Sequence, residues 1–181
     1  MSDDILELTP VQMDALREIG NVGAGNSATA WSQIINHRID MNVPQVSIVP
    51  LGDVPDLVGG PDVMVVGVFL RVYGSAPGNI LFLLPAESAF YLVDMLMGKK
   101  HGETKNLDFM DESALMEIGN ILAGAYLNAL FNLTKLSLLP SILALAVDMA
   151  GAILSVVLIQ LGQMGDHALV IETEFTTDQE G

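Results

Sequence analysis

The chain has 181 residues, of which 51% are hydrophobic, so it is long and apolar enough to bury the core of about one domain. Its 22 acidic residues against 7 Lys and Arg give a formal net charge of -15, which disfavours binding to nucleic acid and to anionic membrane surfaces. The absence of cysteine excludes disulfides, thiol catalysis and cysteine-ligated metals. Because no basic region precedes an apolar stretch at the N-terminus, we expect a cytoplasmic protein.

The first predicted element is a long helix. Thr9, Pro10 and Gln12 provide an N-cap, a proline at the first helical position and a glutamine that reaches back to the cap. Apolar residues recur every three or four positions from Leu16, which predicts a helix to about Asn36. Its middle is rich in glycine and alanine, which predicts close packing against another helix.

Three strand-like runs bounded by proline and glycine follow, at residues 45–51, 63–73 and 79–84. A helix is predicted next, over residues 85–97. Residues 99–106 are polar and few, and we interpret them as a linker between two halves of the chain.

The second half begins with another long helix, predicted from Asp108 to about Phe131. Strands are predicted over residues 141–147 and 167–175. The apolar run at residues 152–161 follows neither the helical nor the strand period, so buried helix and buried strand both stay open.

Residues 136–165 are apolar enough to raise the hypothesis of a membrane span. Pro140, Asp148 and Gly151 interrupt the segment, so we expect no span here.

The most informative feature of the chain is a repeat. Residues 18–25, Glu-Ile-Gly-Asn-Val-Gly-Ala-Gly, return as residues 117–124, Glu-Ile-Gly-Asn-Ile-Leu-Ala-Gly, at an offset of 99 residues. Two copies at so long a period predict a pseudo-two-fold domain rather than a solenoid. We expect a single domain, 1–181, of two half-repeats at about 1–98 and 108–181.

The second half-repeat is incomplete in this prediction. It offers no counterpart of the strand at 79–84 or of the helix at 85–97.

Each copy of the motif places a glutamate and an asparagine three residues apart on one face of a helix, as Glu18 with Asn21 and Glu117 with Asn120. A carboxylate can hold a lysine ammonium, and a carboxamide can orient a water because it both donates and accepts hydrogen bonds. Such orientation is the main task of a protein that hydrolyses an activated phosphoryl group carrying its own metal. The alternative is that the glutamates are ordinary exposed residues and the asparagines join the two helices by hydrogen bonds.

The sequence predicts no metal or cofactor site of its own. His37, His101 and His167 are far apart, and none has a second histidine or carboxylate four residues on in a helix. The glycines at residues 20–25 lie inside a predicted helix, whereas a nucleotide-binding loop follows a strand and opens a helix.

The motif pattern resembles that of the CheC, CheX and FliY chemotaxis phosphatases. The matching segments are Asp14-x-x-x-Glu18-x-x-Asn21 with Pro44 after 22 residues, and Ser113-x-x-x-Glu117-x-x-Asn120. Two copies in one short chain are most similar to CheC-type members. The second copy departs from the pattern, because Pro140 follows Asn120 after 19 residues.

This resemblance implies an α/β fold, of the α+β type, with a long antiparallel sheet backed by the two motif helices and a third helix. It implies hydrolysis of the aspartyl phosphate on the response regulator CheY. Glu18 and Glu117 would engage the regulator's lysine, and Asn21 and Asn120 would position the attacking water, with Asp14 and Ser113 in support. The Mg²⁺ ion would belong to the regulator, and a heterodimer with the deamidase CheD is implied. The alternative is a non-enzymatic adaptor or flagellar-switch-like module of the same fold. Relatives of that kind lack the Glu and Asn pairs, and both pairs are present here.

The charge generates a prediction about salt. The acidic residues are spread along both halves, which favours the surface of a protein from a high-salt cytoplasm over a dedicated site for a basic partner. The screening length falls from about 10 Å at 0.1 M salt to about 3 Å at 1 M, so the thermal midpoint should rise between these concentrations. A flat or falling midpoint in a calorimetric salt series would contradict the halophile hypothesis.

Overall fold

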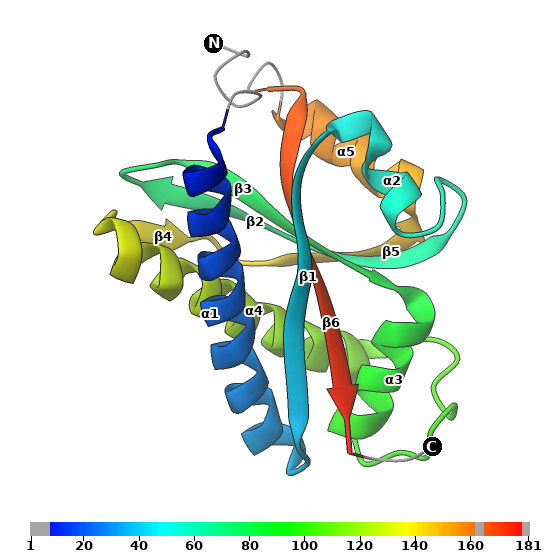
Figure 1. The fold of residues 1–181 in the computed structure, drawn as a ribbon. Coiled ribbons are helices and arrows are strands. Elements are labelled where there is room, and N and C mark those ends of the chain that lie inside the picture. Colours follow the sequence, from blue (N-terminus) through cyan, green and yellow to red (C-terminus); the bar gives the residue numbers. More distant parts are fainter. Residues whose placement is uncertain (1–7, 162–164, 179–181) are drawn as a thin grey trace.

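The computed structural model describes residues 8–161 and 165–178 (Figure 1). The described helices are α1 (Pro10–Ile35), η1 (Leu51–Asp53, a 3-10 turn), α2 (Val54–Leu57), α3 (Ala86–Leu96), α4 (Phe109–Thr134) and α5 (Ala150–Leu161). The described strands are β1 (Ile39–Pro50), β2 (Met64–Gly74), β3 (Gly78–Pro85), β4 (Leu138–Pro140), β5 (Ala144–Met149) and β6 (His167–Thr177). The predicted mixed α/β class is confirmed.

The strands form two antiparallel sheets, where one long sheet was expected. β1 pairs with β6 in a two-stranded sheet, while β2 pairs with β3 on one side and with β4 and β5 on the other. β1 and β2, which η1 and α2 connect along the chain, lie in different sheets and are not paired. The antiparallel pairing itself is as expected.

The described elements of the second half, α4–β4/β5–α5–β6, follow the order α1–β1–α2–β2 of the first half, which then continues with β3 and α3. Each sheet takes a strand from both halves, because β1 pairs with β6 and β2 pairs with β4 and β5. The register of β1 shifts between Asn42 and Gln45, and the break between β4 and β5 falls 99 residues later. The division into two half-repeats stays a prediction.

Both long helices are 26 residues long and begin with a capping box. In α1 the box joins Thr9 and Gln12, as predicted, and in α4 it joins Asp108 and Asp111. Each helix ends at a left-handed residue, and the predicted bounds are confirmed to within three residues.

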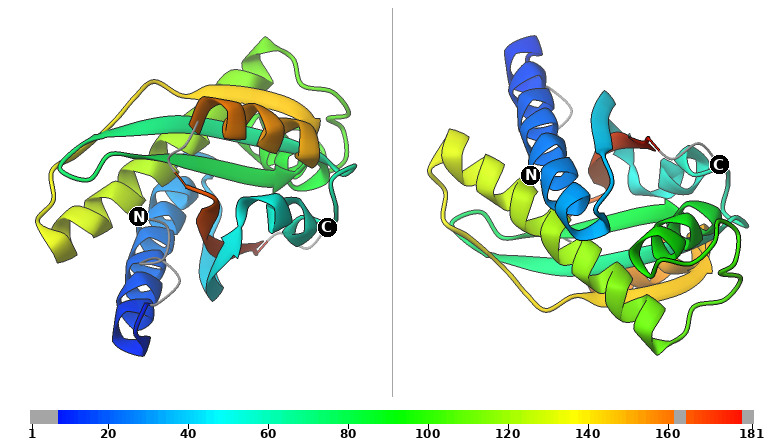
Figure 2. Two further views of the ribbon diagram at one scale, coloured as in Figure 1. Left: turned by 90° about the horizontal axis from the view of Figure 1, so that it is seen from above. Right: turned by 90° about the horizontal axis from the view of Figure 1, so that it is seen from below.

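Helices cover both faces of the sheet around β2. Val66 and Val68 face the helical layer of α4, with Val66 also in the core cluster that includes α3, whereas Val65 packs with α5 on the other face. Figure 2 shows α5 on the side of this sheet away from α4. α4 is long and apolar enough to cross a membrane by length and composition alone, but 44% of its most apolar 18-residue window is buried in the fold.

Three sequence predictions change in detail. The strand predicted over residues 141–147 begins at Ala144 as β5, and residues 138–140 form the separate strand β4. β1 begins at Ile39, six residues before the predicted strand. Pro44 was expected to precede the strand, but it lies inside β1, where the pairing with β6 shifts between Asn42 and Gln45 and the missing N–H of proline is tolerated. The ambiguous run at residues 152–161 lies in helix α5. The described part of the apolar segment 136–165 thus forms two strands and a 12-residue helix.

Polar groups hold the predicted linker against α3 and against the start of α4. The carboxylate of Asp94, 1% exposed, accepts hydrogen bonds from the backbone N–H groups of Gly102 at 2.8 Å and Thr104 at 2.9 Å. Burial raises the pKa of Asp94, but the hydrogen bonds from Thr104 and Gly102 outweigh it, so its pKa is lowered. Lys99 Nζ lies 2.7 Å from Asp111 Oδ1, and this hydrogen bond raises the pKa of Lys99.

Candidate functional site

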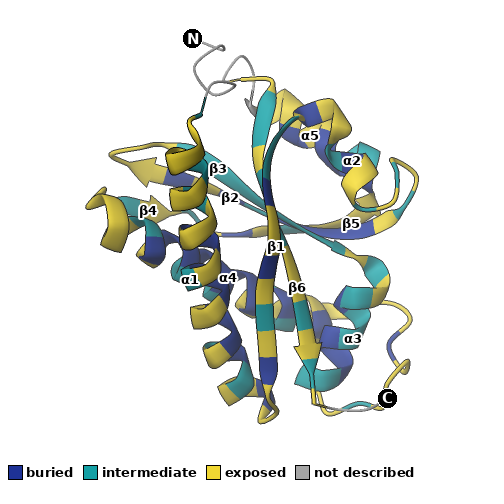
Figure 3. Ribbon diagram, viewed as in Figure 1, coloured by how far each residue is buried: buried dark blue, intermediate teal, exposed yellow. Residues whose placement is uncertain are grey.

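The two copies of the motif have the same pattern of burial. In α1, Ile19 and Gly20 are buried, and the flanking Glu18 and Asn21 are exposed. In α4 the corresponding buried residues are Ile118 and Gly119, and the exposed residues are Glu117 and Asn120. The outer side of α1 is exposed along its length in Figure 3. The fold therefore turns both Glu and Asn pairs toward the solvent.

The buried glycine of each motif, Gly20 in α1 and Gly119 in α4, allows its helix to lie close to the strands beneath it. A Cβ added to Gly20 would lie 3.2 Å from Ile171 of β6 and 3.5 Å from Val43 of β1. A Cβ on Gly119 would lie 2.9 Å from both Leu143, just before β5, and Val68 of β2. Each helix thus rests on strands from both halves of the chain. The recurrence of this glycine in the motif was the sequence signal for these contacts.

A third glycine brings the helices together. A Cβ on Gly23 would lie 2.6 Å from the ring of Tyr126 on α4, closer than any tolerated contact. The hydroxyls of Tyr126 and Thr173 on β6 lie 3.2 Å apart, and burial raises the pKa of Tyr126. The close helix packing predicted from the glycine content is confirmed at this position.

The Glu and Asn pairs have no structural partner within residues 8–161 and 165–178. No hydrogen bond or ion pair joins the side chains of Glu18, Asn21, Glu117 or Asn120 to another residue of that range. The alternative in which the asparagines link the helices by hydrogen bonds is therefore wrong for the described part of the chain. The four side chains are free to contact another molecule.

The two supporting residues differ in their surroundings. Asp14 is exposed one turn before Glu18. Ser113 is also exposed, but its hydroxyl donates to the carbonyl of Phe109 at 2.9 Å, an ordinary bond within the helix.

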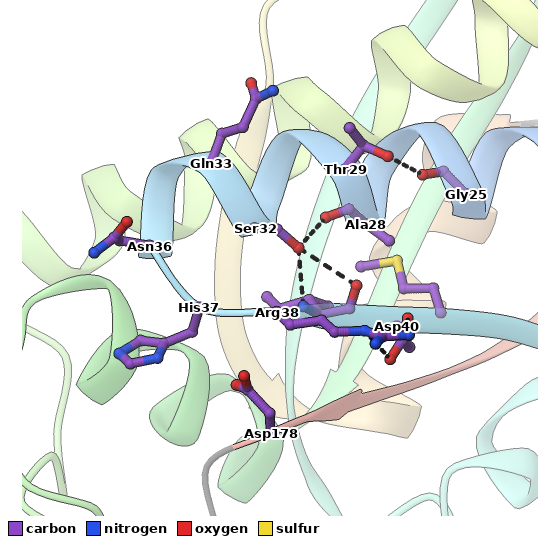
Figure 4. Close-up of a pocket in the computed structure, with 12 residues that line it drawn as sticks. Gly25, Ala28, Thr29, Ser32, Gln33, Asn36, His37, Arg38, Asp40 and Asp178 are labelled. Carbon is purple, nitrogen blue, oxygen red and sulfur yellow. Dashed lines mark hydrogen bonds and ion pairs between the residues drawn. The ribbon is translucent and has the colours of Figure 1, made fainter.

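A surface hollow lies beside the motif rather than over it. It has a volume of about 760 Å³ and extends from Gly25 along the C-terminal half of α1 to Asp178 (Figure 4). Its polar groups bond mainly to one another: Ser32 donates to Ala28 and accepts from Ile39, and an exposed ion pair joins Arg38 to Asp40 at 2.9 Å. None of the predicted site residues lines it. Across the described residues, no group of three or more His, Asp or Glu could hold a metal ion.

These features define a class of protein: a mixed α/β domain whose two motif helices each present a Glu and Asn pair on the surface instead of enclosing a cavity. A family model described as the CheC-like family matches residues 11–48 and 110–141, which contain the two motif helices and the strands that follow them. The chain is 45% identical to the CheY-P phosphatase CheC of Bacillus subtilis, over 90% of this chain and 78% of that relative. This chain belongs to the CheC-like family.

Two solved structures have a similar fold. The crystal structure of Thermotoga maritima FliY matches with a TM-score of 0.78 and 23% identity, over 97% of this chain and 87% of that one. The FliM middle domain from H. pylori matches with a TM-score of 0.70 and 13% identity, over 94% of this chain and 87% of that one. At these identities the likeness shows the fold alone.

The site generates a stability prediction. Gly119→Ala should lose roughly 1–3 kcal/mol of unfolding free energy, because the new methyl group meets Leu143 and Val68. Glu117→Gln and Asn120→Ala should change it by less than about 0.5 kcal/mol, because both side chains are exposed.

Urea unfolding measures these differences. Gly124→Ala is the matched control, because a Cβ there meets nothing within 4 Å and alanine is up to about 1 kcal/mol better than glycine inside a helix. Equal stability of Gly119→Ala and Gly124→Ala would contradict the packing account.

Proposed function

We propose that this protein is a phosphatase that hydrolyses the aspartyl phosphate of the chemotaxis response regulator CheY. The relative that is 45% identical is named a CheY-P phosphatase, and it aligns with 90% of this chain. The observation that carries the proposal is that two Glu and Asn pairs, at one offset, are exposed on helices whose other faces are buried.

In the proposed mechanism, each glutamate docks the regulator and each asparagine prepares the attacking water. Glu18 or Glu117 pairs with the ammonium group of the regulator's active-site lysine, which places the phosphoryl group beside the helix. The asparagine of the same pair, Asn21 or Asn120, lies three residues after the glutamate in the same helix. The Cβ atoms of two helical residues at this spacing are about 5–6 Å apart. Docking and water positioning therefore occur side by side.

The asparagine carboxamide accepts a hydrogen bond from the water and holds its oxygen in line with the bond to be broken. The water oxygen attacks phosphorus, the bond from phosphorus to the aspartyl oxygen breaks, and the aspartate leaves as a free carboxylate with release of inorganic phosphate. Phosphoryl transfer of this kind depends on positioning and charge stabilisation more than on covalent chemistry by the protein. The Mg²⁺ that stabilises the phosphoryl oxygens belongs to the regulator in this proposal.

The second candidate function is a non-enzymatic adaptor or flagellar-switch-like module. The likeness to the FliM middle domain keeps this candidate open, because that similarity concerns the fold. The exposed pairs favour the phosphatase, because an adaptor has no need of two identical, solvent-facing Glu and Asn pairs.

The wider setting of the protein is also part of the proposal. We place it in the cytoplasm with CheY, without a membrane span, and we keep a heterodimer with CheD as the further partner that the family resemblance implies.

The proposal predicts a graded loss of activity. If the two sites are equal and their rates add, Asn21→Ala alone should lose about half of the dephosphorylation rate. Asn21→Ala with Asn120→Ala should lose on the order of 10²- to 10³-fold, as for removal of a group that acts in the transition state. The measurement is the dephosphorylation rate of a phosphorylated CheY-type receiver domain with wild type, both single variants and the double variant.

Each variant is checked for folding by circular dichroism. Unequal sites would make the two single variants differ. A folded double variant with full activity would eliminate the mechanism, and a wild type as inactive as the double variant would favour the adaptor.

A further inference from the structure

Two glycines of the motif have no role in packing among the residues that the structure describes. A Cβ added to Gly25 or to Gly124 would meet no atom within 4 Å, and neither glycine adopts the left-handed backbone that favours this residue. Both lie well inside their helices, where glycine is less favourable than alanine. The fold of the described residues therefore gives no reason for glycine at either position.

The two positions are nevertheless the same in both copies of the motif. The position two residues earlier differs between the copies, with Gly23 in α1 and Leu122 in α4, and Gly23 there contacts Tyr126. Gly25 and Gly124 are the same residue, although packing within residues 8–161 and 165–178 places no demand on them. A demand from outside the chain accounts for this difference.

Their place on the helix points to the source of that demand. Residues seven apart lie on nearly the same line along an α-helix, so Gly25 is aligned with Glu18, two turns before it, and Gly124 with Glu117. Each glycine also lies one turn beyond its asparagine. Each row of residues seven apart therefore passes through a proposed site, on the side of the helix opposite its buried face.

The same lines continue in the other direction to an exposed apolar side chain. Val11 lies seven residues before Glu18 and is 77% exposed, and Met110 lies seven residues before Glu117 and is 58% exposed. Each helix thus presents an apolar side chain, a carboxylate and a glycine at equal spacing, with Gly25 exposed and Gly124 half-buried. Gly25 also lines the hollow shown in Figure 4, so the surface next to it is already recessed.

We propose that Gly25 and Gly124 are positioning residues that let the receiver domain lie directly against the helix backbone. This inference rests on the proposed function, which supplies the occupant of this surface. A side chain at either glycine would hold the receiver away from the helix on the asparagine side. A displacement of about 1 Å at a reacting centre can reduce the rate by about 10²-fold, so clearance one turn from the asparagine bears on the reaction.

The experiment compares wild type with two double variants, Gly25→Ala with Gly124→Ala, and Gly25→Leu with Gly124→Leu. Gly52→Leu is the matched control, because Gly52 is exposed, has no neighbour within 4 Å of an added Cβ and lies in η1, outside both motif helices. Calorimetry measures the Kd for a receiver domain activated with beryllofluoride, a stable mimic of the aspartyl phosphate. Steady-state hydrolysis of the phosphorylated receiver gives KM and kcat, and a thermal scan gives the midpoint.

We expect thermal midpoints of the helix variants at or above that of wild type, because glycine is removed from helix interiors. We expect Kd and KM to rise by at least about 10-fold in the Leu variant and by less in the Ala variant, while Gly52→Leu stays within about 2-fold of wild type. A structural role would instead lower the midpoint together with binding, and that result would overturn the inference.

The remaining outcomes separate this inference from the proposed function. Wild-type Kd and KM in a folded Leu variant would overturn the glycine inference and leave the phosphatase proposal standing. A wild type that binds the activated receiver without hydrolysing phosphate would overturn the phosphatase proposal, and the Kd series would still decide the role of the glycines. A wild type that does not bind would overturn both.

Discussion

The arrangement of this protein depends on how closely the two motif helices approach the strands beneath them. A methyl group on Gly20 would lie in tight contact with Ile171, 3.2 Å away, and one on Gly119 would lie 2.9 Å from both Leu143 and Val68. Because the face of each helix that carries this glycine packs against the strands, the residues on the opposite face point toward the solvent. The Glu and Asn pairs owe their exposure to this contact, which is why the motif combines buried Ile-Gly with flanking Glu and Asn.

The fold and the pairs carry different parts of the functional argument. The mixed α/β arrangement is similar to both FliY and the FliM middle domain, so it does not separate a phosphatase from a switch module. The proposed phosphatase function rests on the pairs, because a carboxylate and a carboxamide with no partner among the described residues have chemistry available for another molecule. A surface site of this kind suits a protein substrate that brings its own phosphoryl group and metal.

The sequence predicted the local structure better than the long-range pairing. The two long helices followed from their caps and apolar spacing, which are local properties. The start of β1 was missed because Pro44 was taken as a boundary, and α5 stayed ambiguous because an apolar run buried against a sheet has no polar face to mark its period. The pairing of β1 with β6 was out of reach, because alternation identifies a strand and not its partner. The repeat singled out the candidate site residues, whose role stays a prediction, whereas the separate packing environments of the glycines could be seen only in the structure.

The structure of this protein bound to a beryllofluoride-activated receiver domain tests the central claim most directly. The account predicts a glutamate of α1 or α4 in an ion pair with the receiver's lysine. It also predicts that the neighbouring asparagine lies within about 2.6–3.2 Å of a water, or of the site that a water would occupy, in line with the phosphoryl mimic. A receiver docked on another surface, with Asn21 and Asn120 both facing solvent, would contradict it.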